Sequence, residues 1–230
     1  MGLTRILGHR GAAQEHPENS LAAFAEARRL GADGVELDVR RSLDGGLVVA
    51  HDPVLKGVGT IAELRVAEVP TSIPLLDAAL EACGEMYVNV ELKFDGGEGP
   101  DAAEAFAAEV LACSLELKER EDLLFSSFAP EVLSALRRLD SEISLGLLLD
   151  YVQDPADFVE FAVDAGFDAL NPFVMTLRDE TIERCKQAGL GLNLWTVNGP
   201  GDLEHLFAAH VDSVITDDVA LAVRIRANGA

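Results

Sequence analysis

The stretch Gly34-Val35-Glu36-Leu37-Asp38-Val39-Arg40 alternates apolar and charged residues within one β-like run. Successive side chains of a strand point to opposite faces, so Glu36 and Asp38 share one face and the three apolar residues share the other. Buried carboxylates are costly unless they are paired, neutralised or bound to a cation. This strand therefore predicts a helix layer against its apolar face and a functional site on its acidic face.

Three other β-like runs are interrupted by polar residues or end in them. Because all four runs carry these residues near their carboxyl ends, we expect the residues to meet in one shared site. They are His9 and Arg10 after residues 6–8, His51 and Asp52 after residues 47–50, and Glu91 and Lys93 within residues 88–93.

The wider pattern alternates short β-like runs with longer helix-like stretches. Such alternation favours parallel strands, and 230 residues suit a (β/α)8 barrel, which typically has about 250. We therefore predict an α/β fold, a (β/α)8 TIM barrel forming a single domain over residues 1–230, with a doubly wound open sheet as the alternative. The predicted barrel strands are Arg5–Gly8, Gly34–Arg40, Met86–Leu92, Leu123–Ser126, Ser144–Leu148, Ala169–Asn171, Gly191–Trp195 and Ser213–Thr216, and Gly46–Ala50 is predicted to form a hairpin with the second.

The predicted helices lie between these strands. Asn19 is expected to cap the first, which ends before Gly31, and a capping pattern over residues 176–179 predicts a helix that ends at Gly189. The other predicted helices are Pro74–Cys83, Asp101–Lys118, Pro130–Leu139 and Pro155–Ala165, and the predicted loose segments are the weakly periodic Lys56–Thr71 and the glycine-rich Asp95–Pro100.

The composition narrows the class of partner. The chain has 18 basic and 40 acidic residues and a formal net charge of −22, which disfavours nucleic acid and anionic membranes as partners. No apolar stretch approaches the roughly 18 residues of a membrane span, and the N-terminus lacks a signal-peptide layout. We therefore expect a cytoplasmic protein without stable membrane association. The three cysteines show no C-x-x-C spacing, which argues against a zinc-thiolate site, and the pattern leaves the oligomeric state open.

Three acidic residues on the predicted inner faces point to a metal site. Two carboxylates about 4 Å apart repel each other by roughly 4 kcal/mol at an effective dielectric constant of 20, and a divalent cation removes that repulsion. Oxygen ligands favour Mg²⁺, Ca²⁺ or Mn²⁺ over zinc. We predict that Glu36, Asp38 and Glu91 hold one divalent cation. The alternative is a network of salt bridges with the neighbouring lysine and arginines.

Two histidines at strand ends suit proton transfer, because an imidazole titrates near neutral pH. We predict that His9 and His51 act as base and acid on opposite sides of a substrate. Arg10 and Lys93 add positive charge that suits a phosphate group. Trp195, the only tryptophan, is predicted to wall the pocket and to contact the rest of the substrate. Together these groups favour phosphoryl chemistry over carbonyl chemistry.

With these features the sequence resembles the glycerophosphodiester phosphodiesterase family. The resemblance spans almost the whole chain, but residues 100–165 carry little of it. Several separate motifs occur in the family's order and spacing. They are His9–Gly11, Pro17–Ser20 with Phe24 and Ala27, Gly31–Asp33, Glu36–Val39, Asp44–Gly45, His51–Asp52, Ile73–Leu76, Asn89–Lys93, Leu194–Asn198 and Val211–Asp217.

The resemblance implies a TIM barrel that uses one divalent cation, Mg²⁺ or Ca²⁺, and a small glycerophosphodiester substrate. It places the metal ligands at the three acidic residues predicted above, the acid/base histidines at His9 and His51, and Arg10 and Lys93 near the phosphate. In such enzymes the glycerol 2-hydroxyl is thought to attack phosphorus and expel the alcohol. Water then opens the cyclic phosphate to sn-glycerol 3-phosphate.

The chain departs from the family pattern in four places. Ser20 replaces the usual threonine, and His16 stands where a small residue is common. The segment Pro53–Ser72 is shorter than in many members, which carry an inserted small subdomain there, and the commonly basic, threonine-containing stretch after His51–Asp52 is reduced to Leu55–Thr60. These departures leave substrate choice open. A lysophospholipase D acting on lysolipids and a non-catalytic barrel that binds phosphodiesters are the alternative functions.

Overall fold

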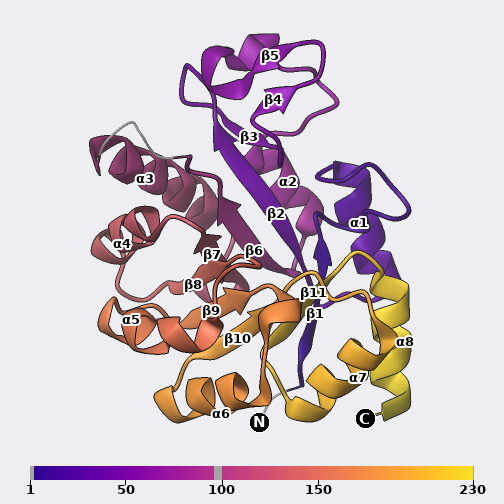
Figure 1. Cartoon of the computed structure of the whole chain (residues 1–230). Helices are drawn as coiled ribbons and strands as arrows, with labels where there is room; N and C mark the ends of the chain where they lie inside the picture. The colour runs from indigo at the N-terminus through magenta and orange to yellow at the C-terminus, as the bar shows by residue number, and fades with distance from the viewer. Residues whose placement is uncertain (1–2, 96–99, 230) are drawn as a thin grey trace.

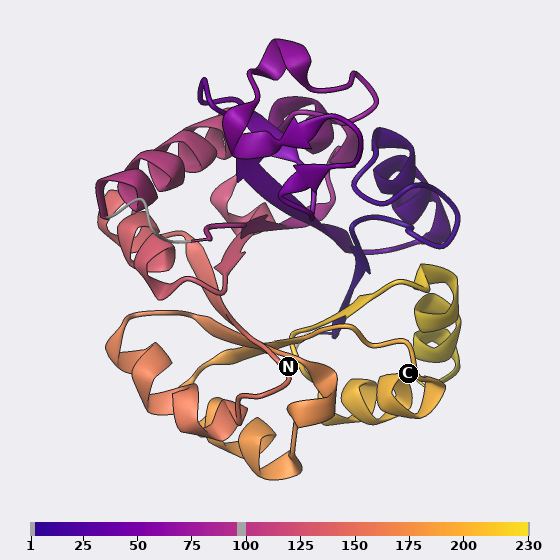
Figure 2. The same ribbon diagram turned by 45° about the horizontal axis from the view of Figure 1, so that its top comes forward.

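The computed structural model describes residues 3–95 and 100–229. In this part of the chain, eight parallel strands close into a barrel (Figure 1, Figure 2), because β1 pairs with β11 on one side and with β2 on the other. The (β/α)8 prediction is therefore confirmed, and the doubly wound open sheet is wrong. The barrel strands are β1 (Arg5–His9), β2 (Gly34–Arg41), β6 (Tyr87–Leu92), β7 (Leu123–Ser127), β8 (Ser144–Leu149), β9 (Ala169–Pro172), β10 (Gly191–Leu194) and β11 (Ser213–Thr216).

The α-helices form a ring around the barrel (Figure 2). The predicted helix at 155–165 starts as a 3₁₀ turn and continues as the short helix α5. The sequence pattern did not delimit α7 and α8. The helices are α1 (Leu21–Leu30), α2 (Leu76–Cys83), α3 (Pro100–Leu117), α4 (Pro130–Leu139), α5 (Val159–Asp164), α6 (Asp179–Ala188), α7 (Pro200–Ala209) and α8 (Val219–Gly229), and the 3₁₀ turns are η1 (Ile61–Glu63), η2 (Val66–Glu68), η3 (Arg120–Asp122), η4 (Pro155–Phe158) and η5 (Val174–Thr176).

The start of α1 corrects one prediction. Ser20, not Asn19, is the N-cap, and its side chain accepts a hydrogen bond from the backbone N–H of Ala23. Asn19 instead takes a left-handed backbone conformation with φ of 56° and donates its amide to Asp38 Oδ2 at 2.7 Å. The predicted stop at Gly31 is confirmed, since this glycine is the left-handed C-cap.

The start of α6 corrects a second prediction, the capping pattern over residues 176–179. The N-cap position belongs to Arg178, and no side chain caps the helix there. The Thr176 hydroxyl, predicted to belong to a capping pattern, donates to the carbonyl of Phe173 in the preceding 3₁₀ turn. The helix ends at the left-handed Gly189, as predicted.

The two faces of β2 have the environments that its sequence predicts. Val35, Leu37 and Val39 are completely buried in the core shared with the helices. The opposite faces of the strands fill the barrel interior with hydrogen-bonded amides and hydroxyls. These contacts join Ser126 to Asn89 at 2.8 Å, Asn193 to Asn171 at 2.8 Å, and Ser213 to Asn193 at 2.6 Å.

A small lobe follows β2. Strand β3 (Leu47–Val49) forms the predicted antiparallel hairpin with β2, and β4 (Val54–Leu55) pairs with β5 (Gly59–Thr60). The segment 56–71, predicted to be loose, contains β5, η1 and η2. Its order comes from a separate apolar cluster. The fully or largely buried members of this cluster are Val48, Leu55, Ile61 and Val69.

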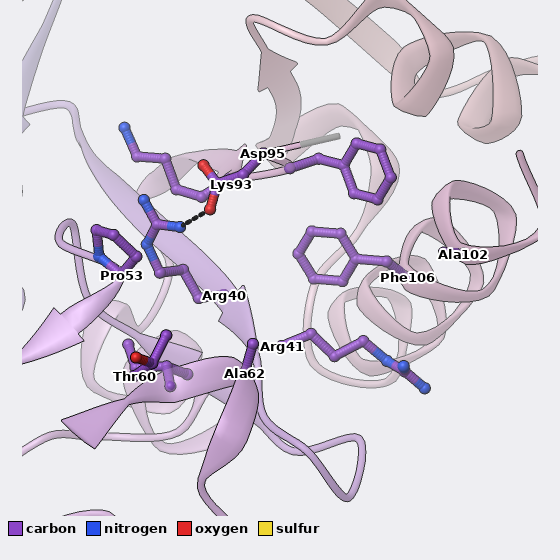
Figure 3. A pocket seen from close by; sticks show the side chains of 11 residues that line it. Arg40, Arg41, Pro53, Thr60, Ala62, Lys93, Asp95, Ala102 and Phe106 are labelled. Carbon is purple, nitrogen blue, oxygen red and sulfur yellow. Dashed lines mark hydrogen bonds and ion pairs between the residues drawn. The ribbon is translucent and has the colours of Figure 1, made fainter. Parts of the chain in front are cut away.

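An ion pair connects the end of β2 with the segment after β6. The Arg40 guanidinium donates to Asp95 at 2.9 Å (Figure 3). Most of the predicted mobile loop Asp95–Pro100 lies outside the described residues. No helix in the described part of the chain is both long and apolar enough to cross a bilayer.

Closure of the barrel depends on a close approach at Gly34. A Cβ atom added there would lie 2.2 Å from the carbonyl oxygen of Tyr87 and 2.7 Å from the Leu7 side chain. We expect Gly34→Ala to destabilise the fold by about 1–3 kcal/mol, the usual cost of overpacking. The measurement is the urea midpoint of unfolding. Gly201→Ala is the matched control, because nothing lies within 4 Å of its added Cβ, and an unchanged midpoint in Gly34→Ala would contradict the expectation.

Candidate active site

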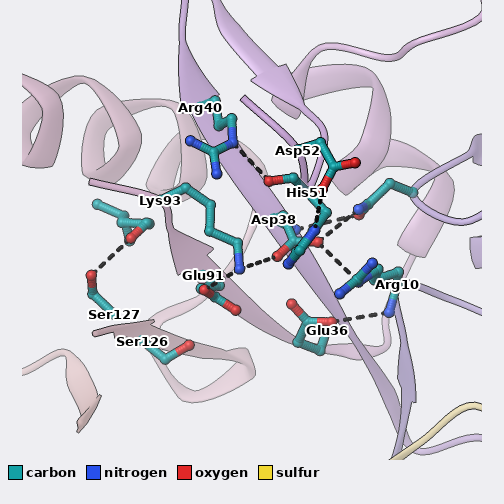
Figure 4. A network of polar contacts seen from close by, with 12 residues as sticks. Arg10, Glu36, Asp38, Arg40, His51, Asp52, Glu91, Lys93, Ser126 and Ser127 are labelled. Carbon is teal, nitrogen blue, oxygen red and sulfur yellow. Dashed lines mark hydrogen bonds and ion pairs between the residues drawn. The ribbon is translucent and has the colours of Figure 1, made fainter. Parts of the chain in front are cut away.

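One pocket at the carboxyl ends of the barrel strands collects the predicted functional residues. Of the predicted residues, Asp38 does not line the pocket. It is 1% exposed and contacts Arg10 and Lys93, which do line it. The pocket has a polar side, formed by β1, β2, β6 and the end of the hairpin (Figure 4), and an apolar side from the strands opposite. It is lined by His9, Arg10, Glu36, His51, Asn89, Glu91, Lys93, Phe128, Leu148, Trp195 and Ile215.

The three predicted acidic ligands converge. Glu36 and Asp38 lie two residues apart on β2, and Glu91 on β6 is the register partner of Asp38. All three are buried, and each offers an oxygen within 4.8 Å of the others. The alternation of strand side chains thus brings the carboxylates together as predicted.

The chain's own cations neutralise only part of this cluster. Lys93 Nζ lies 2.9 Å from Asp38 Oδ1 and 2.5 Å from Glu91 Oε1. Burial raises the pKa of Asp38, but Lys93 and Arg10 outweigh that effect and leave it below its ordinary value. Burial, followed by repulsion from Asp38, raises the pKa of Glu91 to about 7. Burial and both acidic neighbours raise the pKa of Glu36 well above its ordinary value.

The donor atoms fit a hard divalent cation. Glu36 Oε1 is buried and accepts no hydrogen bond from any described residue, although buried oxygens nearly always have a partner. The other nearby ligand atoms are carboxylate oxygens, which suit Mg²⁺, Ca²⁺ or Mn²⁺. The residues therefore form a possible metal site, while the geometry does not select one ion.

Arg10 is held in an uncommon backbone conformation beside the acidic cluster. Its φ of 58° lies in the left-handed region, where residues other than glycine are strained. This conformation lets its backbone N–H donate to Glu36 Oε2 at 3.0 Å. The guanidinium donates to Glu18 at 2.8 Å, and its Nε lies 3.4 Å from Asp38 Oδ2. Its charge is thereby placed at the pocket wall.

Each histidine of the pocket has a carboxylate at Nδ1. His9 Nδ1 lies 2.7 Å from Asp217 Oδ1, and His9 Nε2 lies 4.0 Å from Glu36 Oε2. Burial raises the pKa of Asp217, but hydrogen bonds from His9 and Asn198 outweigh it and keep that pKa low. An ionised Asp217 accepts a hydrogen bond from Nδ1–H, so the neutral His9 ring has its lone pair on Nε2.

His51, which follows the β2–β3 hairpin, has a similar arrangement. Its Nδ1 lies 2.8 Å from Asp52 Oδ1. Arg40 Nε donates to the His51 carbonyl at 2.8 Å, which fixes the backbone at this position. The His51 side chain is 37% exposed and that of His9 is 19% exposed, so His51 lies nearer the solvent.

Trp195 belongs to the apolar side of the pocket, as predicted. Its indole N–H donates to the Asn171 carbonyl at 2.8 Å. The edges of Phe128 and Phe173 pack against it, with ring centroids 5.6 and 5.4 Å away. Lys93 Nζ lies 5.9 Å from the Phe128 ring centroid, so this ring borders both sides of the pocket.

Several residues of the site escaped the prediction from sequence, among them Asp217, Asn19 and Phe128. Asp217 lies 208 positions from His9 and becomes its neighbour only when the barrel closes, although the closing Val211–Asp217 motif contained it. Asn19 was expected to cap a helix. Phe128 follows β7 in a part of the chain without a recognisable motif.

Comparison with known proteins agrees with this geometry. The model of the glycerophosphoryl diester phosphodiesterase family matches residues 9–221. A glycerophosphodiester phosphodiesterase of Caldanaerobacter subterraneus subsp. tengcongensis is 30% identical, over 98% of this chain and 99% of its own length.

Solved structures show the same barrel. That of a glycerophosphodiester phosphodiesterase from Thermotoga maritima has a TM-score of 0.80 and 30% identity, covering 98% of this chain and 99% of its own. A phosphodiesterase from Oleispira antarctica, solved in complex with the product sn-glycerol-3-phosphate, has a TM-score of 0.86 at 24% identity and covers 98% and 97%. By sequence and by fold, this chain belongs to the glycerophosphoryl diester phosphodiesterase family.

Proposed function

We propose that the protein hydrolyses glycerophosphodiesters to sn-glycerol 3-phosphate and an alcohol, with His9 and His51 as the acid/base pair and one divalent cation, Mg²⁺ or Ca²⁺. One observation supports this most strongly. A buried acidic cluster with an unsatisfied oxygen shares a pocket with two imidazoles, each held at Nδ1 by a carboxylate. The product bound to the Oleispira antarctica relative is consistent with this substrate class.

The proposed metal ligands are Glu36, Asp38 and Glu91. A cation bound there would supply charge neutralisation for the phosphate oxygens. Arg10 and Lys93 contribute fixed positive charge at the pocket wall, which binds and orients the phosphate. Trp195 provides an apolar surface that keeps water from one side of the substrate.

The histidines divide the proton transfers. His9 Nε2 takes the proton of the glycerol 2-hydroxyl while the oxygen bonds to phosphorus, and Asp217 stabilises the resulting imidazolium. The bond from phosphorus to the alcohol oxygen breaks, and His51, nearer the solvent, gives that oxygen a proton. In the second half His51 takes a proton from water, the hydroxide opens the cyclic phosphate, and His9 returns its proton to the 2-oxygen.

The direct test is an activity screen. Purified protein with Mg²⁺, Ca²⁺ or Mn²⁺ is expected to release glycerol 3-phosphate from a panel of glycerophosphodiesters, and EDTA is expected to abolish release. Excess cation should also raise the melting temperature, because a ligand that binds only the folded state stabilises it. Binding of the diesters without turnover would instead support the non-catalytic barrel.

A second candidate function is a lysophospholipase D, and the surface around the pocket favours it. Large apolar side chains are exposed on the loops that follow β7, β8 and β9, next to the apolar side of the pocket. They are Phe128, Tyr151, Val152 and Met175. An acyl chain could lie on such a surface. Release of choline from lysophosphatidylcholine, with no action on glycerophosphocholine, would select this function over the first.

Location in the cytoplasm, independence from nucleic acid and the extent of the domain over residues 1–230 stay predictions of the sequence. The formal net charge of −22 supports the second of these.

A further inference from the structure

A second pocket lies beside the candidate active site and shares Lys93 with it. It opens between the end of β2, the small lobe around β4 and β5, and the first turns of α3 (Figure 3), and its volume is about 100 Å³. Because Lys93 lines both pockets, a molecule whose phosphate lies in the first can extend into the second. The mechanism proposed above assigns no role to this second pocket.

The contacts of Arg40 indicate which catalytic residue this pocket adjoins. Its Nε donates to the His51 carbonyl at 2.8 Å, so the pocket wall is directly connected to His51. In the proposed reaction His51 protonates the departing alcohol. The second pocket therefore adjoins the backbone of the residue proposed to protonate the departing alcohol, whereas His9 is not among its lining residues.

The polar groups of the pocket can recognise a hydroxyl. The Arg40 side chain is only 10% exposed, one of its terminal nitrogens donates to Asp95, and the other has no acceptor among the described residues. Asp95 is 71% exposed, so its carboxylate can accept a further hydrogen bond. A hydroxyl both accepts and donates, so it can bond to the guanidinium and the carboxylate at once. Phe94 and Phe106 give the remaining surface an apolar character that suits a carbon skeleton.

The polar groups of the pocket suit a hydroxyl better than a quaternary ammonium group. The positive side chains that line it are already paired, Arg40 with Asp95, Arg41 with Glu109, and Lys93 with Asp38 and Glu91. A trimethylammonium group neither donates nor accepts a hydrogen bond, so it would leave the remaining Arg40 nitrogen and the Asp95 carboxylate without the bonds that a hydroxyl supplies. A neutral polyol can make both bonds.

We propose that this pocket binds the alcohol group of the diester and that it selects a polyol, such as glycerol or inositol, over choline. The proposal rests on the phosphodiesterase function proposed above. It makes Arg40 and Asp95 specificity-determining residues, and it assigns the small lobe and the start of α3 to substrate selection.

The test compares kcat/KM for three substrates: glycerophosphoglycerol, glycerophosphoinositol and glycerophosphocholine. We expect the unmodified protein to favour the two polyol diesters by about tenfold, which corresponds to roughly one net hydrogen bond to a charged group. Ala102→Leu narrows the pocket from α3 and is expected to raise KM for the polyol diesters at least several-fold, with kcat/KM for glycerophosphocholine changed less than about twofold. Asp95→Asn should reduce the preference in the same direction.

The matched control is Ala105→Leu, the same substitution at an exposed position of α3 outside the pocket, and it should leave all three values unchanged. Similar kcat/KM for all three diesters in the unmodified protein would overturn the subsite while leaving the phosphodiesterase intact. An equal loss of kcat/KM for all three diesters in Ala102→Leu would likewise overturn the subsite and leave the phosphodiesterase intact. Failure of the unmodified protein to hydrolyse any diester would overturn the proposed function, and the subsite with it.

Discussion

His9→Ala and His51→Ala are each expected to lower kcat/KM for a glycerophosphodiester at least 100-fold, the low end of what acid–base catalysis contributes. Each variant loses one of two proton transfers that the other histidine cannot replace, because the two rings belong to different strand ends. Cation binding should survive in both, since neither ring is a proposed metal ligand. The measurements are steady-state kinetics and the cation-induced rise in melting temperature.

Two further variants test this prediction more specifically. Asp217→Asn keeps the side chain's size but can donate to Nδ1, which favours the wrong tautomer of His9, so kcat should fall at least about tenfold with little change in KM. His205→Ala is the control, because His205 is exposed and pairs with Asp179 on a neighbouring helix. Turnover that persists unchanged in both His9→Ala and His51→Ala would refute the assignment of these residues.

Glu36→Gln is expected to abolish most of the activity and yet to stabilise the metal-free protein at alkaline pH. Losing a ligand of the proposed cation removes several kcal/mol of transition-state stabilisation, so we expect a loss of at least about 100-fold in kcat/KM. The cation-induced rise in melting temperature should disappear as well, because the same carboxylate serves both effects.

The stability effect follows from the raised pKa of Glu36. Burial and two acidic neighbours raise this pKa in the folded state above its value in the unfolded chain. The folded state therefore favours the protonated form, and the stability that this group contributes is present at low pH and is lost as the pH rises through the folded-state pKa. Glutamine stays neutral at every pH. In EDTA, the melting temperature of the unmodified protein should thus fall relative to that of the variant as the pH rises from the ordinary pKa of a glutamate toward alkaline values.

Glu131→Gln, on an exposed part of α4, serves as the control. It should change neither kcat/KM nor the pH dependence of the melting temperature. A cation that stabilises Glu36→Gln as much as the unmodified protein would rule out Glu36 as a ligand.

The acidic cluster could be predicted because it follows from one short-range rule, the alternation of side chains along a strand. The barrel could be predicted because strand-like and helix-like segments alternate over a length that suits this fold. Glu36 and Asp38 had to share a face, and parallel neighbours bring their carboxyl ends to one edge. The predicted strand limits agree with those observed to within one residue at each end. The roles of the histidines, Arg10, Lys93 and Trp195 stay predictions, since they depend on a substrate and an ion.

Other features depend on contacts that no local pattern contains. Asn19 looks like a helix cap because its residue type suits one, but the neighbouring Ser20 takes that position and the Asn19 amide bonds to Asp38. Segment 56–71 looks loose because two-residue strands and 3₁₀ turns show no periodicity, and its order comes from a separate apolar cluster. The second pocket joins β2, the lobe and α3, which are distant in sequence.

The pairing of β1 with β11 has a consequence for the protein's synthesis. The ribosome makes His9, the acidic cluster and His51 within the first 91 residues, but Asp217 emerges long afterwards. Until the last strand docks, the imidazole lacks its orienting carboxylate and the first strand has an open edge. A nascent chain therefore carries most of its chemical groups early but cannot assemble a working centre until synthesis has passed β11 and Asp217.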